Sequence, residues 1–152
     1  STFCIAKSMC DNKIQGEITT VDPNLNEDFL NQLYKIFPNE WFKKINFVKS
    51  TAEDFYKTSQ EKNFDFIYID GDHRYEAVKK DWEYAKERFN QHLLFDDYHL
   101  PTKEIKDIEC AKLIDEIKGY DKELIFMDRR IFFDDRRIKD KDIDYGQVLI
   151  RK

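Results

Sequence analysis

The sequence predicts an α/β fold in which helices cover a mostly parallel sheet. Hydrophobic periodicity switches repeatedly between the strand and the helix pattern along the chain, which is typical of alternating strands and helices. The β-rich segments also end in turn residues, as parallel strands followed by a connection should. With 152 residues and 41% hydrophobic content, the chain can bury one core, so we expect a single domain over residues 1–152.

The first half alternates short helices and strands. Proline has no N–H and ends the strand that precedes Asp22-Pro23. Asn26 can cap a helix whose apolar residues recur at spacings of three and four until Pro38. The expected elements are a helix over 1–10, a strand over 17–21, a helix over 27–37, a strand over 46–49 and a helix over 52–59.

The second half contains the strongest strand signal, FDFIYI at 64–69. Its nearly continuous apolar character favours a central strand that is buried on both faces. Trp82 falls at helical core spacing, and Gly119 follows a helix as a C-terminal cap would. The expected elements are a strand over 64–69, a helix over 75–89, a short strand over 93–95, a helix over 103–117, and strands over 124–133 and 147–150 that form an antiparallel pair.

Composition excludes several classes of partner. Charged residues make up 38% of the chain, but both signs are interleaved and the net charge is -5, so we expect no binding to nucleic acid. No apolar run is long enough to span a bilayer, and we expect no membrane association. The three cysteines are an odd number outside any C-x-x-C spacing, which favours buried thiols in a reducing, cytoplasmic compartment. A homo-oligomer is compatible with the sequence.

Acidic residues gather at the predicted carboxyl ends of strands. Ligands of open α/β sheets bind there, because loops converge and helix N-termini present free N–H groups. A carboxylate at the position of Asp22 can accept hydrogen bonds from the two hydroxyls of a ribose. The strand ends carry Asp22, then Ser50-Thr51, then Asp70-Gly71-Asp72-His73, then Asp96-Asp97-Tyr98-His99.

Asp70, Asp96 and Asp97 are candidate ligands of a divalent cation. Carboxylates packed together raise one another's pKa unless a cation compensates them, and hard oxygen ligands suit Mg²⁺, Ca²⁺ or Mn²⁺. The structural alternative is that Asp96 or Asp72 caps the following helix and the other acids face water.

His73 and His99 are candidate general bases, because histidine titrates near neutral pH and both follow the acidic pairs. A histidine at a helix start is also a common surface or capping residue. Tyr98 can line a substrate pocket.

The string FDFIYIDGDHRYEAVKKDWEYA, followed by LLFDDYH, resembles the class I S-adenosylmethionine-dependent methyltransferases of the small-molecule O-methyltransferase type. The resemblance implies a three-layer Rossmann-like sheet, mostly parallel with an antiparallel C-terminal strand. It also implies an enzyme that binds S-adenosylmethionine and transfers a methyl group to a small-molecule acceptor, with Mg²⁺ or another divalent cation assisting.

The resemblance assigns roles residue by residue. Asp22 matches the acid that binds the ribose, and Thr51-Ala52-Glu53 match the turn that lies against the adenine. Asp70 matches a residue that lies near the methyl donor and also binds the metal. Asp96 and Asp97 match the other two metal ligands. His73 falls where catechol-type members place a catalytic lysine, so that position implies a catalytic base of a different residue type.

One part of the family pattern has no counterpart here. The family begins its sheet with a strand that ends in a glycine-rich loop, and this sequence opens at Ser1, where that loop would lead into the first helix. We expect the strand and the loop to precede Ser1 in a longer protein, because their loss would leave apolar strand edges bare. The alternative is a protein that does not bind the donor in the usual way.

The leading interpretation is methyl transfer from S-adenosylmethionine to a hydroxyl, less favourably an amine, of a sugar or phenolic compound. A second interpretation is a non-catalytic or signalling α/β module that binds Mg²⁺ through Asp70, although no lysine ends the strand over 93–95. A third is a metal-dependent hydrolase or hydroxylase that uses the same three acids.

Overall fold

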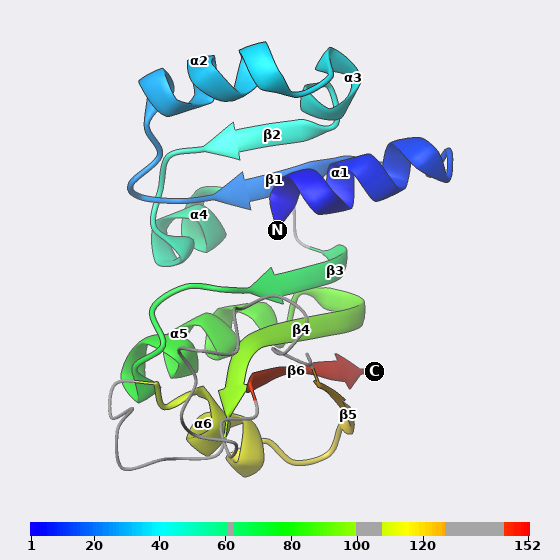
Figure 1. Ribbon diagram of the computed structural model, residues 1–152. Helices are drawn as coiled ribbons and strands as arrows, with labels where there is room; N and C mark the ends of the chain where they lie inside the picture. Colours follow the sequence, from blue (N-terminus) through cyan, green and yellow to red (C-terminus); the bar gives the residue numbers. More distant parts are fainter. Residues whose placement is uncertain (61–62, 100–107, 127–144) are drawn as a thin grey trace, which may run out of the picture. The chain divides into compact units, whose positions relative to one another are not determined.

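A computed structural model describes residues 1–60, 63–99, 108–126 and 145–152 (Figure 1). The chain divides into two compact units, Ser1–Ser59 and Gln60–Lys152, which we describe one at a time. The expectation of a single domain over residues 1–152 stays a prediction.

The first unit contains a pair of parallel strands and four helices among its described residues. β1 and β2 pair in parallel from Ile18 with Ile45 to Val21 with Val48. A parallel pair needs a crossover connection, and α2 and α3 supply it. The elements are α1 (Thr2–Asp11), β1 (Ile18–Val21), α2 (Glu27–Ile36), α3 (Asn39–Phe42), β2 (Ile45–Val48) and α4 (Ala52–Thr58). All were expected within one or two residues except α3, which follows Pro38 directly.

Aromatic rings hold the first unit together. The ring of Phe3 on α1 stacks on Phe37 at 4.8 Å between centroids and meets Phe42 edge-on at 5.0 Å. Such ring pairs add to the stability that burial of apolar area supplies. The predicted cap of α2 is confirmed, because the side chain of Asn26 accepts a hydrogen bond from the Phe29 N–H at 3.1 Å.

The second unit is a four-stranded mixed sheet in the order β3-β4-β6-β5. β3 and β4 are parallel, and β6 runs antiparallel to both of its neighbours, β4 and β5. The predicted antiparallel pair of C-terminal strands is therefore confirmed. The elements are β3 (Phe64–Ile69), α5 (Tyr75–Ala85), β4 (Phe89–His99), α6 (Cys110–Glu116), β5 (Asp121–Phe126) and β6 (Tyr145–Arg151).

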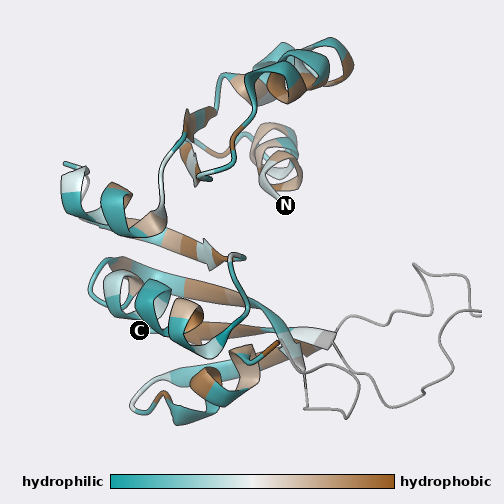
Figure 2. Ribbon diagram, turned by 90° about the vertical axis from the view of Figure 1, so that its left-hand side faces the viewer, coloured by the Kyte–Doolittle hydropathy of each residue, from teal (hydrophilic) through white to brown (hydrophobic). Residues whose placement is uncertain are grey.

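The core of the second unit lies on one face of this sheet. Successive strand residues point to opposite faces, so residues paired across strands form rows. One row joins Ile67, Leu93 and Ile150, and the exposed fraction of Leu93 and of Ile150 is 0%. Trp82 of α5 and Ile114 of α6 are buried too, as expected for Trp82. Figure 2 shows hydrophobic residues gathered along the strands and hydrophilic residues over much of the helices.

Two expectations about the strands were wrong. β3 is not buried on both faces: it pairs with β4 alone among the described residues, and 42% of Phe66 is exposed. β4 is far longer than the expected 93–95, because it starts at Phe89, where a continuous helix from Tyr75 was predicted. The backbone turns instead after Ala85, and this allows Phe89 to pair with Phe64. The acidic pair Asp96-Asp97 therefore lies inside a strand and not beyond its end.

Further expectations are settled in part. α6 begins at Cys110, and the predicted helical residues 103–107 lie outside the described residues, as do residues 127–133 of the expected strand. All three thiols are free, and burial is confirmed for Cys110, whereas Cys4 is exposed. In the described part of the chain, no helix has the length and apolar character to cross a membrane.

Candidate functional site

In the first unit, Asp22 borders a hollow of about 470 Å³. The hollow is lined by the start of α1, the end of β1 and the start of α2, with Thr2, Thr20 and Phe29 among its residues. Oδ1 of Asp22 accepts a hydrogen bond from the Asn24 N–H at 2.8 Å, which fixes the carboxylate at the strand end. The volume lies in the range of small-molecule sites, and an acid at its edge can bind hydroxyl groups.

The predicted adenine turn lies at the start of α4. The Thr51 hydroxyl caps this helix by accepting from the Asp54 N–H at 3.1 Å, and it donates to the Asp54 carboxylate at 2.9 Å. Glu53 pairs with Lys57 one helical turn later. Thr51, Ala52 and Glu53 do not line the hollow beside Asp22, so their predicted contact with a ligand stays a prediction.

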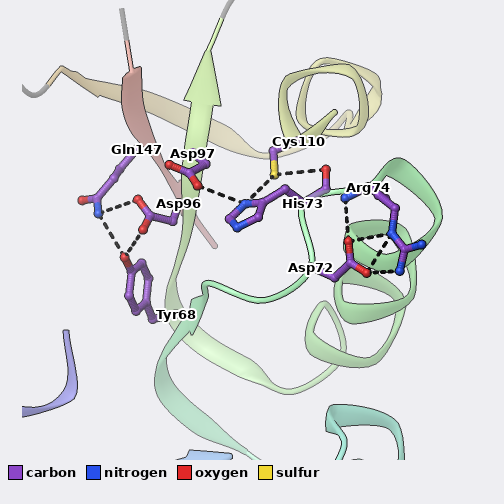
Figure 3. A network of polar contacts seen from close by, with 8 residues as sticks. All are labelled: Tyr68, Asp72, His73, Arg74, Asp96, Asp97, Cys110 and Gln147. Atoms are coloured by element: carbon purple, nitrogen blue, oxygen red, sulfur yellow. Dashed lines mark hydrogen bonds and ion pairs between the residues drawn. The ribbon is translucent and has the colours of Figure 1, made fainter. Parts of the chain in front are cut away.

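In the second unit, three neighbouring strands contribute to a polar network around Asp96 (Figure 3). The Tyr68 hydroxyl of β3 donates to Oδ2 of Asp96 at 2.6 Å. The amide nitrogen of Gln147 on β6 donates to Oδ1 of Asp96 at 3.0 Å and also lies 3.2 Å from the Tyr68 hydroxyl. Burial opposes ionisation of Asp96, but these hydrogen bonds outweigh it and lower the pKa of this carboxyl.

Asp70, at the end of β3, belongs to the same network. Burial, followed by the charges of Asp96 and Asp97, raises the pKa of Asp70, whose carboxyl hydrogen-bonds Asp96. The pKa of Asp70 is therefore shifted in the direction opposite to that of Asp96. Asp70 thus lies close to Asp96, as expected, whereas its predicted roles in donor and metal binding stay predictions.

Asp97 turns away from this network towards His73. Its backbone has φ of +50°, in the left-handed region that aspartate tolerates better than most residues. The residue lies in a β-bulge, because the pairing of β4 with β6 shifts between Phe95 and Tyr98. The bulge directs the carboxylate to His73, with Oδ2 of Asp97 3.0 Å from Nδ1 of the imidazole (Figure 3).

The loop that carries His73 is fastened to the residues before α6. The His73 carbonyl accepts from the Glu109 N–H at 2.8 Å, and the Glu109 carboxylate accepts from the Tyr75 N–H at 3.0 Å. The Cys110 sulfur lies 3.8 Å from the same carbonyl and 3.9 Å from Nδ1 of His73. Burial, followed by the charge of Asp97, raises the pKa of Cys110 to about 12, so this thiol stays protonated.

The remaining predicted residues have simpler surroundings. Asp72 accepts from the backbone and the guanidinium of Arg74, and these hydrogen bonds lower its pKa to about 2. The alternative that Asp72 caps the following helix is therefore not confirmed, because the N-cap of α5 is Arg74 and the helix has no side-chain cap hydrogen bond. Tyr98 donates to Asp115 of α6 at 3.1 Å. The backbone of His99 pairs with Tyr145, whereas its side chain lies outside the described part of the structure.

The described residues do not fit a divalent cation in this arrangement. No three of the histidine, cysteine, aspartate and glutamate side chains that the structure describes are grouped so that they could hold a metal ion. The two oxygens of Asp96 each accept from a neutral donor, and Asp97 is directed to His73. A cation held by three carboxylates would require these contacts to break.

Sequence reasoning missed the residues that hold the network in place. These are Tyr68 and Gln147, which bind Asp96, and Glu109 and Cys110, which hold the His73 loop. The alternation of side chains along β3 could have pointed to Tyr68. This residue precedes the DGDH motif by two positions, so its side chain lies on the same face of the sheet as that of Asp70. No local signal pointed to Gln147, which comes from 51 residues farther along the chain than Asp96.

Comparison with known proteins defines the family. Residues 1–98 match the family described as "Methyltransferase domain". A comparison with curated proteins finds no significant match. Among solved structures, cofactor-bound Rv0187 from MTB superposes with a TM-score of 0.64 at 16% identity, over 99% of this chain and 66% of that one. The O-methyltransferase TomG from Streptomyces achromogenes gives a TM-score of 0.56 at 10% identity, over 90% of this chain and 62% of that one.

The chain thus spans less than two thirds of the length of either solved protein. The superpositions confirm the predicted Rossmann-like methyltransferase fold, with a parallel-rich sheet and an antiparallel strand. Because the family match covers well over half of the sequence and runs through both the Asp22 strand end and the DGDH motif, this chain belongs to the family of methyltransferase domains.

Proposed function

We propose that the protein is an S-adenosylmethionine-dependent methyltransferase that acts on a hydroxyl group of a small molecule, such as a sugar or a phenol. The observation that carries the proposal is the family match, together with an acid and a hollow at the end of β1 and a histidine held by a carboxylate after β3. The two solved structures, one cofactor-bound and the other in complex with SAM, support the choice of donor.

The first unit would supply the donor site. Asp22 keeps Oδ2 available after Oδ1 has accepted from Asn24, and an ionised carboxylate is a strong acceptor for ribose hydroxyls. Phe29 and Phe47 give the hollow apolar walls suited to an adenine ring. When bound, S-adenosylmethionine supplies a methyl group on a positively charged sulfur, which an oxygen nucleophile can attack.

The second unit would prepare the acceptor. A hydroxyl becomes a better nucleophile when a base removes its proton during the attack. Nδ1 of His73 faces Asp97, so Nε2 is the nitrogen that remains for the proton of the acceptor. About a third of the imidazole is exposed, which leaves it accessible to a substrate.

The direct test is calorimetric titration of the complete protein with S-adenosylmethionine, followed by mass analysis of candidate acceptors for the gain of one methyl group. Asp22→Ala removes a charged hydrogen-bond acceptor and should weaken donor binding about 10- to 100-fold, since such bonds contribute about 1.5–3 kcal/mol. Asp11→Ala, on the exposed end of α1, is the matched control. Absence of heat with the unmodified protein would eliminate the proposal.

Whether the reaction requires a divalent cation is a separate question. The predicted participation of Mg²⁺ through Asp70, Asp96 and Asp97 would require these side chains to rearrange, so we propose a reaction that does not depend on it. A metal-dependent hydrolase or hydroxylase would need the same rearrangement. Product mass separates these readings, because hydrolysis and hydroxylation add no methyl group.

A further inference from the structure

We propose that Asp97 is a positioning residue that fixes the tautomer and the direction of His73. The role of His73 as a base rests on the proposed function. The assignment of Asp97 rests on geometry alone.

The first observation is that the two adjacent acids, Asp96 and Asp97, contact different partners. Asp96 is held by Tyr68 and Gln147, whose donors occupy both of its oxygens at 2.6 Å and 3.0 Å. Asp97 contacts neither of them in the described structure and instead lies 3.0 Å from His73. Figure 3 shows the two carboxylates of this pair directed to different partners. A tandem pair of metal ligands would need to converge on one point.

The second observation is the backbone conformation that directs the two carboxylates to different partners. In a regular strand, Asp97 would continue the ladder with β6, but two residues, Asp96 and Asp97, stand opposite Gln147 alone. The extra residue adopts φ of +50°, which is a costly conformation for most side chains. The residue with this strained backbone is the one whose carboxylate reaches the imidazole. Strained residues of this kind cluster at functional sites.

The third observation is that the histidine is held from several sides. Its carbonyl accepts from the Glu109 N–H at 2.8 Å, and the Cys110 sulfur lies within 3.9 Å of both the carbonyl and Nδ1. With the loop fixed, the Asp97 carboxylate can accept only if Nδ1 carries a hydrogen. Nε2 then has the lone pair, because a neutral imidazole bears one N–H.

The chemical step balances without a metal. The acceptor oxygen forms a bond to the methyl carbon while the bond from that carbon to the donor sulfur breaks. The hydroxyl proton moves to Nε2 of His73, and the Asp97 carboxylate beside Nδ1 stabilises the imidazolium. The imidazolium returns its proton to water after the methylated product leaves, and the sulfur keeps the electron pair of the broken bond.

The tautomer of His73 provides a test that needs neither donor nor acceptor. Long-range nitrogen–proton NMR of protein labelled with ¹⁵N-histidine should show an Nδ1–H tautomer for His73. Asp97→Asn should change it to the Nε2–H tautomer, because the amide can donate to Nδ1 while asparagine still tolerates the left-handed backbone. Asp72→Asn, at an exposed acid paired with Arg74, should leave the tautomer unchanged. An Nε2–H tautomer in the unmodified protein overturns the proposal.

Metal binding is tested on the same sample. Titration with Mn²⁺ should not broaden the His73 signals selectively, and calorimetry with Mg²⁺ should show no saturable binding. Saturable binding that disappears in both Asp96→Asn and Asp97→Asn would establish a metal centre and overturn the proposal.

Kinetics separate this proposal from the proposed function. Asp97→Asn should lower kcat about 10- to 100-fold with little change in KM for the acceptor, with partial rescue in Asp97→Glu, and EDTA should not inhibit the unmodified enzyme. A loss confined to KM would overturn the positioning role. If the tautomer results are as expected but no acceptor is methylated, the assignment of Asp97 stands and the proposed function fails.

Discussion

The replacement Asp81→Asn should stabilise the protein at neutral pH and not at acidic pH. Asp81 lies on α5 beside the residues that form the core face of that helix, Val78, Trp82 and Ala85. Burial, followed by the charge of Asp72, raises the pKa of Asp81 from 3.8 to about 6. No hydrogen bond reaches its carboxylate from the residues that the structure describes, so ionisation costs free energy that nothing nearby offsets.

The size of the stability change follows from the linkage between proton binding and folding. A folded-state pKa raised above the unfolded value means that the folded protein binds the proton more tightly, so stability falls as pH rises from about 4 to about 6. The difference between 3.8 and about 6 corresponds to about 3 kcal/mol at 1.36 kcal/mol per pH unit. Because part of Asp81 remains exposed, water screens the charge, and we expect about 1–3 kcal/mol.

Urea unfolding at pH 4, 5, 6 and 7.5 measures the effect. The stability gain of Asp81→Asn should be close to zero at pH 4 and complete at pH 7.5, with an unchanged dependence on urea. Glu87→Gln, which replaces an exposed carboxylate just beyond the same helix, should show no comparable rise. A gain of equal size at every pH would refute the electrostatic reasoning, and so would a loss at pH 7.5.

Three further predictions concern stability and are measured by thermal unfolding. Leu93→Ala leaves a cavity at a fully buried position and should cost about 2–5 kcal/mol, whereas Leu124→Ala, at a residue 39% exposed, should cost far less; equal losses would contradict the proposed core. Asn26→Ala removes the cap of α2 and should lower the free energy of unfolding by about 1 kcal/mol, whereas Asn26→Asp should retain most of the stabilisation by the cap. Gly146→Ala would place a Cβ 2.9 Å from the Ile125 carbonyl oxygen and should destabilise the β5–β6 pair; an unchanged stability would argue against that close approach.

Local pattern was sufficient for the type of most elements. The FDFIYI strand at 64–69 was predicted at its observed bounds, because a run of β-branched and aromatic residues ends in a turn motif. The end of the 75–89 helix was missed, because Phe89 fits both the helical spacing and the start of a strand. Pairing with Phe64 on the parallel neighbour decided that choice, and such pairing is not visible in local spacing.

For the candidate site, the sequence by itself determined which residue types could do chemistry, and the pairing of Ile69 with Phe95 then placed Asp70 near Asp96. Only the tertiary structure decided their partners. A bulge at Asp97 directs one acid to His73, and Gln147 from a distant strand joins Tyr68 in holding the other. The side chain a carboxylate meets depends on strand register and local backbone twist, which long-range pairing sets and sequence spacing does not encode.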